Sequence, residues 1–177
     1  MPYRIYGTKD SQNDYAEDLN SRSLTSNFLA GGSCYLPTDT GLCVPIELSL
    51  AVHSDAGYRP DSSLVGTLGI HTTGKYTKGE FEGLLAEGLF PSGVSRLTSY
   101  ALCDSVMTQV CSDLTRLTGS WPRRELYDRN YSETRLPRVP SMILEMFSHQ
   151  NWADLLRAHD PTFKFHMARA IYKGLLR

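Results

Sequence analysis

Charged or polar side chains that end two apolar runs are the best candidates for chemistry in this sequence. In LSLAVHSDAG an apolar run ends at His53, and Asp55 follows before a glycine. In SMILEMFSHQN, Glu145 follows Met-Ile-Leu and still lies inside an apolar run. A carboxylate there is costly unless it is paired or binds a cation. A histidine that binds zinc and a glutamate that acts as a base are the basic pairing of zinc hydrolases, so we predict a site around His53 and Glu145 if their strands are neighbours.

Each of these residues also has a purely structural interpretation. A lone histidine at a strand end is often a hydrogen-bonded histidine at the rim of a sheet. Asp55 either orients a metal-bound histidine or water, or forms a turn before Ala-Gly. A buried Glu145 would instead pair with a nearby cation, for which the candidates are Arg135, Arg138 and Lys164. These alternatives stay open at the level of the sequence.

The other histidines are weaker candidates. His149 either caps the helix that follows it or lines a substrate site, and His71 in GTLGIHTT is a less expected zinc ligand. His159 and His166 are expected on the surface or in packing. Arg22 is expected to be an ion-pair partner within the structure rather than a substrate clamp.

Strand-like and helical patterns alternate along the chain, which indicates an α/β domain. Turn residues, caps and glycines separate the segments. The strands are expected at 3–7, 46–53, 63–73 and 139–147, and the helices at 15–30 with Asn13 or Asp14 as cap, at 78–88, 95–117, 151–158 and 163–176.

Composition limits the class of protein. The 177 residues are 41% hydrophobic and carry a net charge of -1, which fits one globular domain and gives no electrostatic signature of nucleic-acid binding. The sequence contains no run of 18 apolar residues, the length that a membrane-spanning helix needs. The start, MPYRIYGTKD, has no apolar signal core, so we expect any secretion signal to lie upstream.

The four cysteines do not form a zinc motif, because none stands in a C-x-x-C pair. Cys34 and Cys43 flank a loop-like segment and could form a disulfide in an oxidising compartment. Cys103 and Cys111 fall in a helical pattern, where we expect them to be buried as small apolar residues.

The order of the motifs resembles the catalytic domain of zinc-dependent N-acetylmuramoyl-L-alanine amidases. In that family a strand ending in Thr-Arg precedes a helix with a leucine, an arginine and an alanine-asparagine pair. A later strand ends in Ser-Ile-His-x-Asn. The last motif is an apolar strand that ends in the catalytic glutamate. YGTKDSQNDYAEDLNSRSLTSN, LAVHSDAG and SMILEMFSHQNWADL are similar. The matching residues are Thr8-Lys9, Asp10, Leu19, Arg22, Ser26-Asn27, His53, Asp55 in place of the asparagine, and Glu145. The ending resembles a subgroup of secreted or envelope proteins, sometimes labelled xanthan lyases, that often carry further β-sandwich modules.

The resemblance implies a three-layer α/β/α domain over residues 1–177, with a mostly parallel or mixed sheet flanked by helices. It implies hydrolysis of the bond between N-acetylmuramic acid and L-alanine in peptidoglycan, Zn²⁺ as cofactor, and a periplasmic or secreted location. His53 becomes a zinc ligand, Glu145 the catalytic residue, and Asp55 and His149 substrate-binding candidates.

The family's first zinc histidine and its zinc glutamate precede the Thr-Arg strand. We therefore expect this chain to be about the C-terminal two-thirds of the domain, to lack its first strand and helix, and to be inactive alone. The alternatives are a domain that binds cell-wall glycan without metal and, less expected, a polysaccharide lyase.

Overall fold

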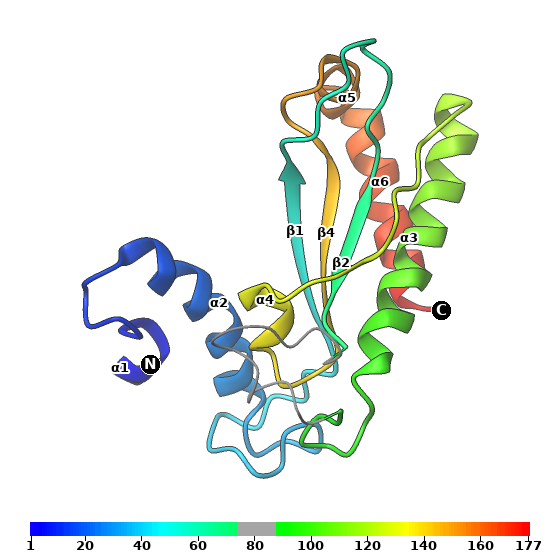
Figure 1. The fold of residues 1–177 in the computed structure, drawn as a ribbon. Coiled ribbons are helices and arrows are strands. Elements are labelled where there is room, and N and C mark those ends of the chain that lie inside the picture. The colour runs from blue at the N-terminus through cyan, green and yellow to red at the C-terminus, as the bar shows by residue number, and fades with distance from the viewer. Residues whose placement is uncertain (74–87) are drawn as a thin grey trace. The chain divides into compact units, whose positions relative to one another are not determined.

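The computed structural model describes residues 1–73 and 88–177, which form an α/β protein on a four-stranded sheet (Figure 1). The strands lie in the order β1-β4-β2-β3, and β4 pairs antiparallel with β2. Hydrogen bonds join Ser49 N to Pro140 O at the start of β1 and His149 N to Asp55 O at its end, both at 2.9 Å, so β1 runs parallel to β4. The predicted α/β class with a mixed sheet is confirmed. The strands are β1 (Ser49–Asp55), β2 (Leu68–His71), β3 (Tyr127–Asp128) and β4 (Ser141–Ser148).

The described part of the chain also contains six helices. Their starts follow the expected local signals: the Asn13 side chain accepts a hydrogen bond from Ala16 N, and Asp160 accepts one from Thr162 N just before the helix that Pro161 opens. The helix expected at 78–88 falls almost wholly on 74–87, outside the described residues. The helices are α1 (Tyr3–Tyr6), α2 (Asp14–Ala30), α3 (Leu97–Thr118), α4 (Ser132–Arg135), α5 (Trp152–Ala158) and α6 (Pro161–Leu175).

The chain divides into two compact units, and each draws on three separate stretches of sequence. The first unit comprises Met1–Leu50, His71–Tyr100 and Asp128–Met142. The second unit comprises Ala51–Ile70, Ala101–Tyr127 and Ile143–Arg177. His53, Asp55, Glu145 and His149 all belong to the second unit.

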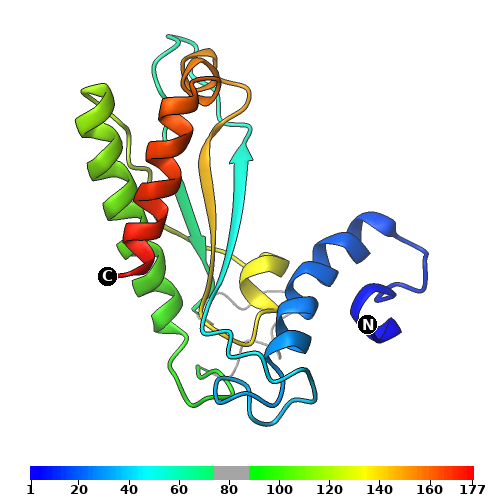
Figure 2. The same cartoon turned by 180° about the vertical axis from the view of Figure 1, so that it is seen from behind.

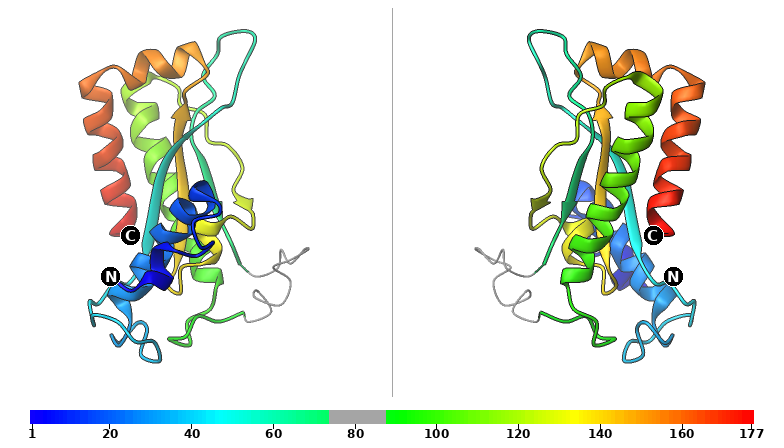
Figure 3. Two further views of the ribbon diagram at one scale, coloured as in Figure 1. Left: turned by 90° about the vertical axis from the view of Figure 1, so that its left-hand side faces the viewer. Right: turned by 90° about the vertical axis from the view of Figure 1, so that its right-hand side faces the viewer.

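In the second unit, α3 and α6 cover one face of the strands (Figure 2). Helix α3 approaches β2 closely at Gly69, where an added Cβ would lie 2.5 Å from Cys103 Sγ and 2.8 Å from Met107 Cγ. Only glycine fits there. The Trp121 and Phe163 rings pack 5.1 Å apart in this core, and α5 lies beyond the ends of β1 and β4 (Figure 3). Further buried residues are Val106, Val110, Leu114, Leu144, Met167 and Ala170.

In the first unit, α2 is tied to the chain around α4 by side-chain hydrogen bonds. Asn27 Nδ2 donates to Leu136 O at 2.9 Å, and Asn27 Oδ1 accepts from Arg138 N at 2.9 Å. Arg22 pairs with Asp18 and, at 3.2 Å, with Glu133. The prediction that Arg22 is an internal ion-pair partner is confirmed.

The strand predicted at 3–7 is wrong, because Tyr3–Tyr6 form a short helix. Ile5 N and Gly7 N donate to Pro2 O and Tyr3 O, at 3.0 and 2.8 Å. These residues pair with no strand of the described sheet, so the backbone closes its hydrogen bonds locally. The pair Thr8-Lys9, which the resemblance places at a strand end, lies in a turn instead.

Strand β2 is shorter than the predicted 63–73. Gly66 has φ +80°, and side-chain oxygens take the hydrogen bonds of Val65 N and Gly66 N, so the ladder begins only at Leu68. Strand β1 is displaced by two or three residues from 46–53 and includes Asp55, which is therefore a strand residue and not a turn residue.

Cys103 and Cys111 are buried as predicted, and burial raises the pKa of their thiols to about 12 and about 11. Cys34 and Cys43 are exposed and free. None of the helices in residues 1–73 and 88–177 combines the length and apolar composition that crossing a membrane requires.

Candidate functional site

His53 and Glu145 lie on the face of the sheet opposite to α3. Gly69 faces α3, so its neighbours Leu68 and Ile70 face the other way and form a cluster with Ile143. Ala51 packs against this cluster. His53 follows Ala51 by two residues on β1, and Glu145 follows Ile143 by two residues on β4. Because β1 and β4 are neighbouring parallel strands, His53 and Glu145 share this face and come close together.

Both side chains are half-buried on regular strands. A strand fixes the direction of its side chains more firmly than a loop does, which suits groups that must meet at a reacting atom. The pair offers an imidazole nitrogen, which can bind a metal or a proton, and a carboxylate, which can accept a proton. The predicted pairing of the two strands is thus present.

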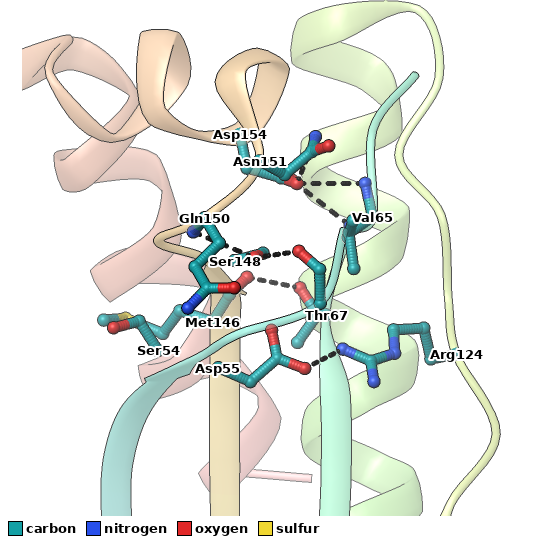
Figure 4. A network of polar contacts seen from close by, with 12 residues as sticks. Ser54, Asp55, Val65, Thr67, Arg124, Met146, Ser148, Gln150, Asn151 and Asp154 are labelled. Atoms are coloured by element: carbon teal, nitrogen blue, oxygen red, sulfur yellow. Dashed lines mark hydrogen bonds and ion pairs between the residues drawn. The ribbon is translucent and has the colours of Figure 1, made fainter. Parts of the chain in front are cut away.

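Asp55 ends β1 on the same face and forms an ion pair with Arg124 (Figure 4). Their side chains are 17% and 22% exposed, so solvent only partly screens the pair. Asp55 Oδ1, the other carboxylate oxygen, is buried and accepts no hydrogen bond from the described residues. Asp55 therefore presents one acceptor that a water or a cation could satisfy.

Arg124 is held in place through its backbone and through Thr67. Arg124 N donates to Thr67 O at 3.0 Å, and Thr67 N donates to Pro122 O at 3.2 Å. The buried Thr67 hydroxyl donates to Met146 O and accepts from Trp121 Nε1, at 2.9 and 2.8 Å. Hydrogen bonds within the second unit thus fix the backbone that places the Arg124 guanidinium beside Asp55.

Asn151 and Asp154 fasten the loop that follows Asp55 (Figure 4). Both side chains are fully buried. Asp154 accepts from Val65 N at 3.0 Å, from Gly66 N at 3.2 Å and from Asn151 Nδ2 at 2.9 Å. Asn151 Nδ2 also donates to Ser63 O, and Asn151 Oδ1 accepts from Arg59 N. The Asp154 carboxylate therefore accepts hydrogen bonds from backbone N–H groups of the 59–66 loop.

His149 does not cap α5, because the N-cap residue is Asn151. The His149 ring is exposed, and its Nδ1 lies 3.1 Å from Ser54 Oγ. Side chains alternate along a strand, so Ser54 points to the face opposite His53 and Asp55. The His149 contact is therefore on the other side of β1 from the candidate site.

His71 does not join the candidate site. It lies two residues from Gly69 and so points to the opposite face of β2 from Leu68 and Ile70. Its ring is buried and packs edge-on against Tyr100 at 5.3 Å. Burial lowers the pKa of His71 below its ordinary value of 6.5, and Asp128 acts in the opposite direction.

The buried His71 makes stability depend on pH. Below about pH 6.5 the unfolded chain binds a proton at this residue that the folded chain resists, so the free energy of unfolding falls as the pH falls, by at most about 1.4 kcal/mol per pH unit. Urea unfolding between pH 7.5 and 5 should show a smaller acid loss in His71→Gln than in the wild type. The exposed His159 provides the control: His159→Gln should keep the wild-type slope, and an unchanged slope in His71→Gln would refute the assignment.

The described residues do not fit a zinc ion by themselves. No group of three or more His, Cys, Asp or Glu side chains within residues 1–73 and 88–177 could hold a metal ion. Catalytic zinc sites use three protein ligands, so His53 is at most one member of such a set.

Comparisons with solved structures identify the fold. The chain is similar to an N-acetylmuramoyl-L-alanine amidase from Clostridium difficile 630, with 13% identity, a TM-score of 0.58, and coverage of 98% of this chain and 76% of that one. It is also similar to the CwlD amidase from Clostridioides difficile, solved in complex with the GerS lipoprotein, with 16% identity, a TM-score of 0.61, and coverage of 96% and 66%. The chain has the amidase fold.

A third similar structure is the catalytic domain of CwlV, an N-acetylmuramoyl-L-alanine amidase from Bacillus (Paenibacillus) polymyxa var. colistinus, with 16% identity, a TM-score of 0.50, and coverage of 93% of this chain and 85% of that one. No family model matches the sequence, and no curated protein matches it. The chain thus spans between 66% and 85% of the length of these three structures, and the likeness concerns the fold.

Sequence reasoning missed Arg124 and the loop-fastening roles of Asn151 and Asp154. The spacing of Asn151 and Asp154 at the start of a helical pattern is an ordinary helix-start signal, and it points to a cap instead of a distant loop. Arg124 stands among several cations in WPRRELYDR, and nothing local distinguishes it.

Proposed function

We propose that this chain is an amidase-type domain that acts on the peptidoglycan of the cell envelope, at the amide between N-acetylmuramic acid and L-alanine. The observation that supports it is the placement of His53 and Glu145 on one face of two neighbouring strands in an amidase fold. An envelope or secreted location follows from that substrate and is part of the proposal.

Glu145 is the proposed catalytic residue. Its carboxylate accepts a proton from the water that attacks the amide carbonyl carbon, and it delivers a proton to the leaving nitrogen as the C–N bond breaks. The products are the carboxylate on the muramic acid side and the free amino group of alanine. No electron acceptor or further reactant is needed.

His53 is the proposed protein ligand of a zinc ion, with the remaining ligands supplied by residues other than the described ones. Asp55, whose Oδ1 is buried and accepts no hydrogen bond from the described residues, is the proposed acceptor for the histidine or a bound water. When bound, zinc would polarise the scissile carbonyl and stabilise the oxyanion. His149, which contacts Ser54 on the other side of β1, has no role in this proposal.

Metal analysis tests this proposal. In the natural protein, mass spectrometry after zinc loading and desalting should find about one zinc per chain. The change His53→Ala should weaken zinc affinity at least about tenfold, because one of three ligands is lost. The exposed His159→Ala is the matched control and should retain zinc. Unchanged zinc content in His53→Ala would remove His53 from the ligand set.

A second candidate is a domain that binds cell-wall glycan without metal. It is favoured by the Asp55–Arg124 pair, which places a guanidinium beside the site, and by the lack of a three-ligand group among the described residues. Sedimentation with insoluble peptidoglycan distinguishes the two. Binding that survives chelation, with no zinc and no release of amino groups, supports this second candidate and contradicts the first.

A further inference from the structure

The segment 56–67, which joins β1 to β2, begins beside the candidate site (Figure 1). Gly57 lies against the side chain of Asp55: a Cβ added to Gly57 would stand 3.4 Å from Asp55 Oδ2 and 3.5 Å from Asp55 Oδ1. The Cα atom of the next residue, Tyr58, follows that of Gly57 by about 3.8 Å. Tyr58 is therefore attached to the backbone right next to a carboxylate of the candidate site.

Hydrogen bonds fix the backbone on both sides of Tyr58. Ser148 Oγ donates to Gly57 O, and Arg59 N donates to Asn151 Oδ1 at 3.3 Å. Ser148 and Asn151 are both fully buried. A segment that is already ordered loses little conformational freedom when it binds a ligand, so less of the binding energy is lost in ordering it.

The tip of the same segment is ordered by further hydrogen bonds. Ser62 N donates to Arg59 O at 3.0 Å, and Asn151 Nδ2 donates to Ser63 O at 2.9 Å. Asp61 Oδ1 accepts from Ser63 N at 3.0 Å and from Ser63 Oγ at 2.8 Å. The segment is thus held from Gly57 to Ser63 before any ligand arrives.

The Tyr58 side chain points away from this fixed backbone into solvent. It is 67% exposed, and it makes no hydrogen bond or ring contact with the described residues. A tyrosine ring offers a large apolar face and a polar hydroxyl at its tip. An ordered backbone that presents such a ring beside a site is suited to bind a flat ligand with an apolar face and polar edges.

We propose that Tyr58 stacks on a sugar ring of the glycan strand that carries the scissile amide. One face of a pyranose consists of C–H groups, which pack on the phenol ring, and its hydroxyl groups lie at the edge. Arg59 and Asp61, whose side chains are exposed on the same segment, supply a donor and an acceptor for those hydroxyls. The inference rests on the proposed function and names the glycan as the part of the substrate that this segment binds.

Calorimetric titration of the natural protein with N-acetylchitohexaose, a glycan without peptides, tests the contact in the presence of a chelator. We expect saturable binding that is about tenfold weaker in Tyr58→Ala, because an aromatic contact is lost. Tyr58→Phe keeps the ring and should bind within about twofold of the wild type. The matched control is Tyr172→Ala, which removes an exposed tyrosine of α6 and should leave the affinity unchanged. Since both tyrosines are exposed, the variants should keep the wild-type circular dichroism spectrum.

Three results would overturn the proposal: wild-type affinity in Tyr58→Ala, an affinity in Tyr58→Phe as low as in Tyr58→Ala, or no saturable binding of the glycan. Tighter binding of the peptide L-alanyl-D-glutamate than of the glycan, lost in Tyr58→Ala, would assign Tyr58 to the peptide and overturn it as well.

The titration needs neither metal nor turnover, so it separates this inference from the proposed hydrolysis. Glycan binding that depends on Tyr58, in a protein that releases no amino groups from peptidoglycan, would contradict the hydrolytic function alone. Hydrolysis without binding of the glycan would contradict the role of Tyr58 alone.

Discussion

Replacing Glu145 by glutamine is expected to slow hydrolysis of the muramoyl–L-alanine amide by about 10³-fold in the zinc-loaded natural protein. Glutamine keeps the size of the side chain and its place on β4 opposite Leu68, but it cannot accept a proton from water at neutral pH. Release of free amino groups from purified peptidoglycan measures the rate. The loss should appear in kcat with little change in KM, because the proton transfer occurs in the transition state.

The control is Glu125→Gln, which alters an exposed glutamate of the same unit and should leave turnover unchanged. Both variants should unfold at the same urea concentration as the wild type. Turnover within a few fold of the wild type in Glu145→Gln would remove this residue from the mechanism, whatever the metal content.

The second large effect is on stability. Asp154→Ala should lower the free energy of unfolding by about 3 kcal/mol or more, because Val65 N, Gly66 N and Asn151 Nδ2 lose their acceptor in a fully buried place. That is a large share of the 5–15 kcal/mol of a typical domain. Urea unfolding followed by tryptophan fluorescence measures it, since Trp121 lies in the same unit.

Two further variants sharpen this test. Asp160→Ala removes an exposed helix cap that holds only Thr162 N, and it should cost about 1 kcal/mol. Asp154→Asn keeps the shape of the side chain but places an amide N–H donor opposite the backbone N–H donors of the loop. It should therefore lower the free energy of unfolding nearly as much as Asp154→Ala. A cost for Asp154→Ala no larger than for Asp160→Ala would show that the 59–66 loop does not depend on this carboxylate.

The Asp154 contacts also bear on the proposed site. The loop that they fasten follows Asp55 directly, and Asp55 is two residues from His53. A variant that loosens this loop should therefore reduce activity through the placement of Asp55, without touching substrate. In the proposed mechanism Asp154 is therefore a positioning residue.

The sequence alone determined the features that arise from local interactions. The α2 and α6 starts could be predicted from Asn13 and from Asp160-Pro161, because a cap is decided within a few residues. The apolar run of β4 and the places of His53 and Glu145 near strand ends were also predictable. The sharing of one sheet face by these two residues was predicted only on condition that their strands are neighbours.

Only the tertiary structure decided the features that depend on distant partners. Tyr3–Tyr6 has strand-like composition but becomes a helix, since strand formation requires a neighbour that this segment lacks in the described sheet. Asp55 and Arg124 are 69 residues apart, and Asp154 is 89 residues from Val65. Such pairings depend on the order of the strands and on what packs around them, and no local pattern of residue types encodes either.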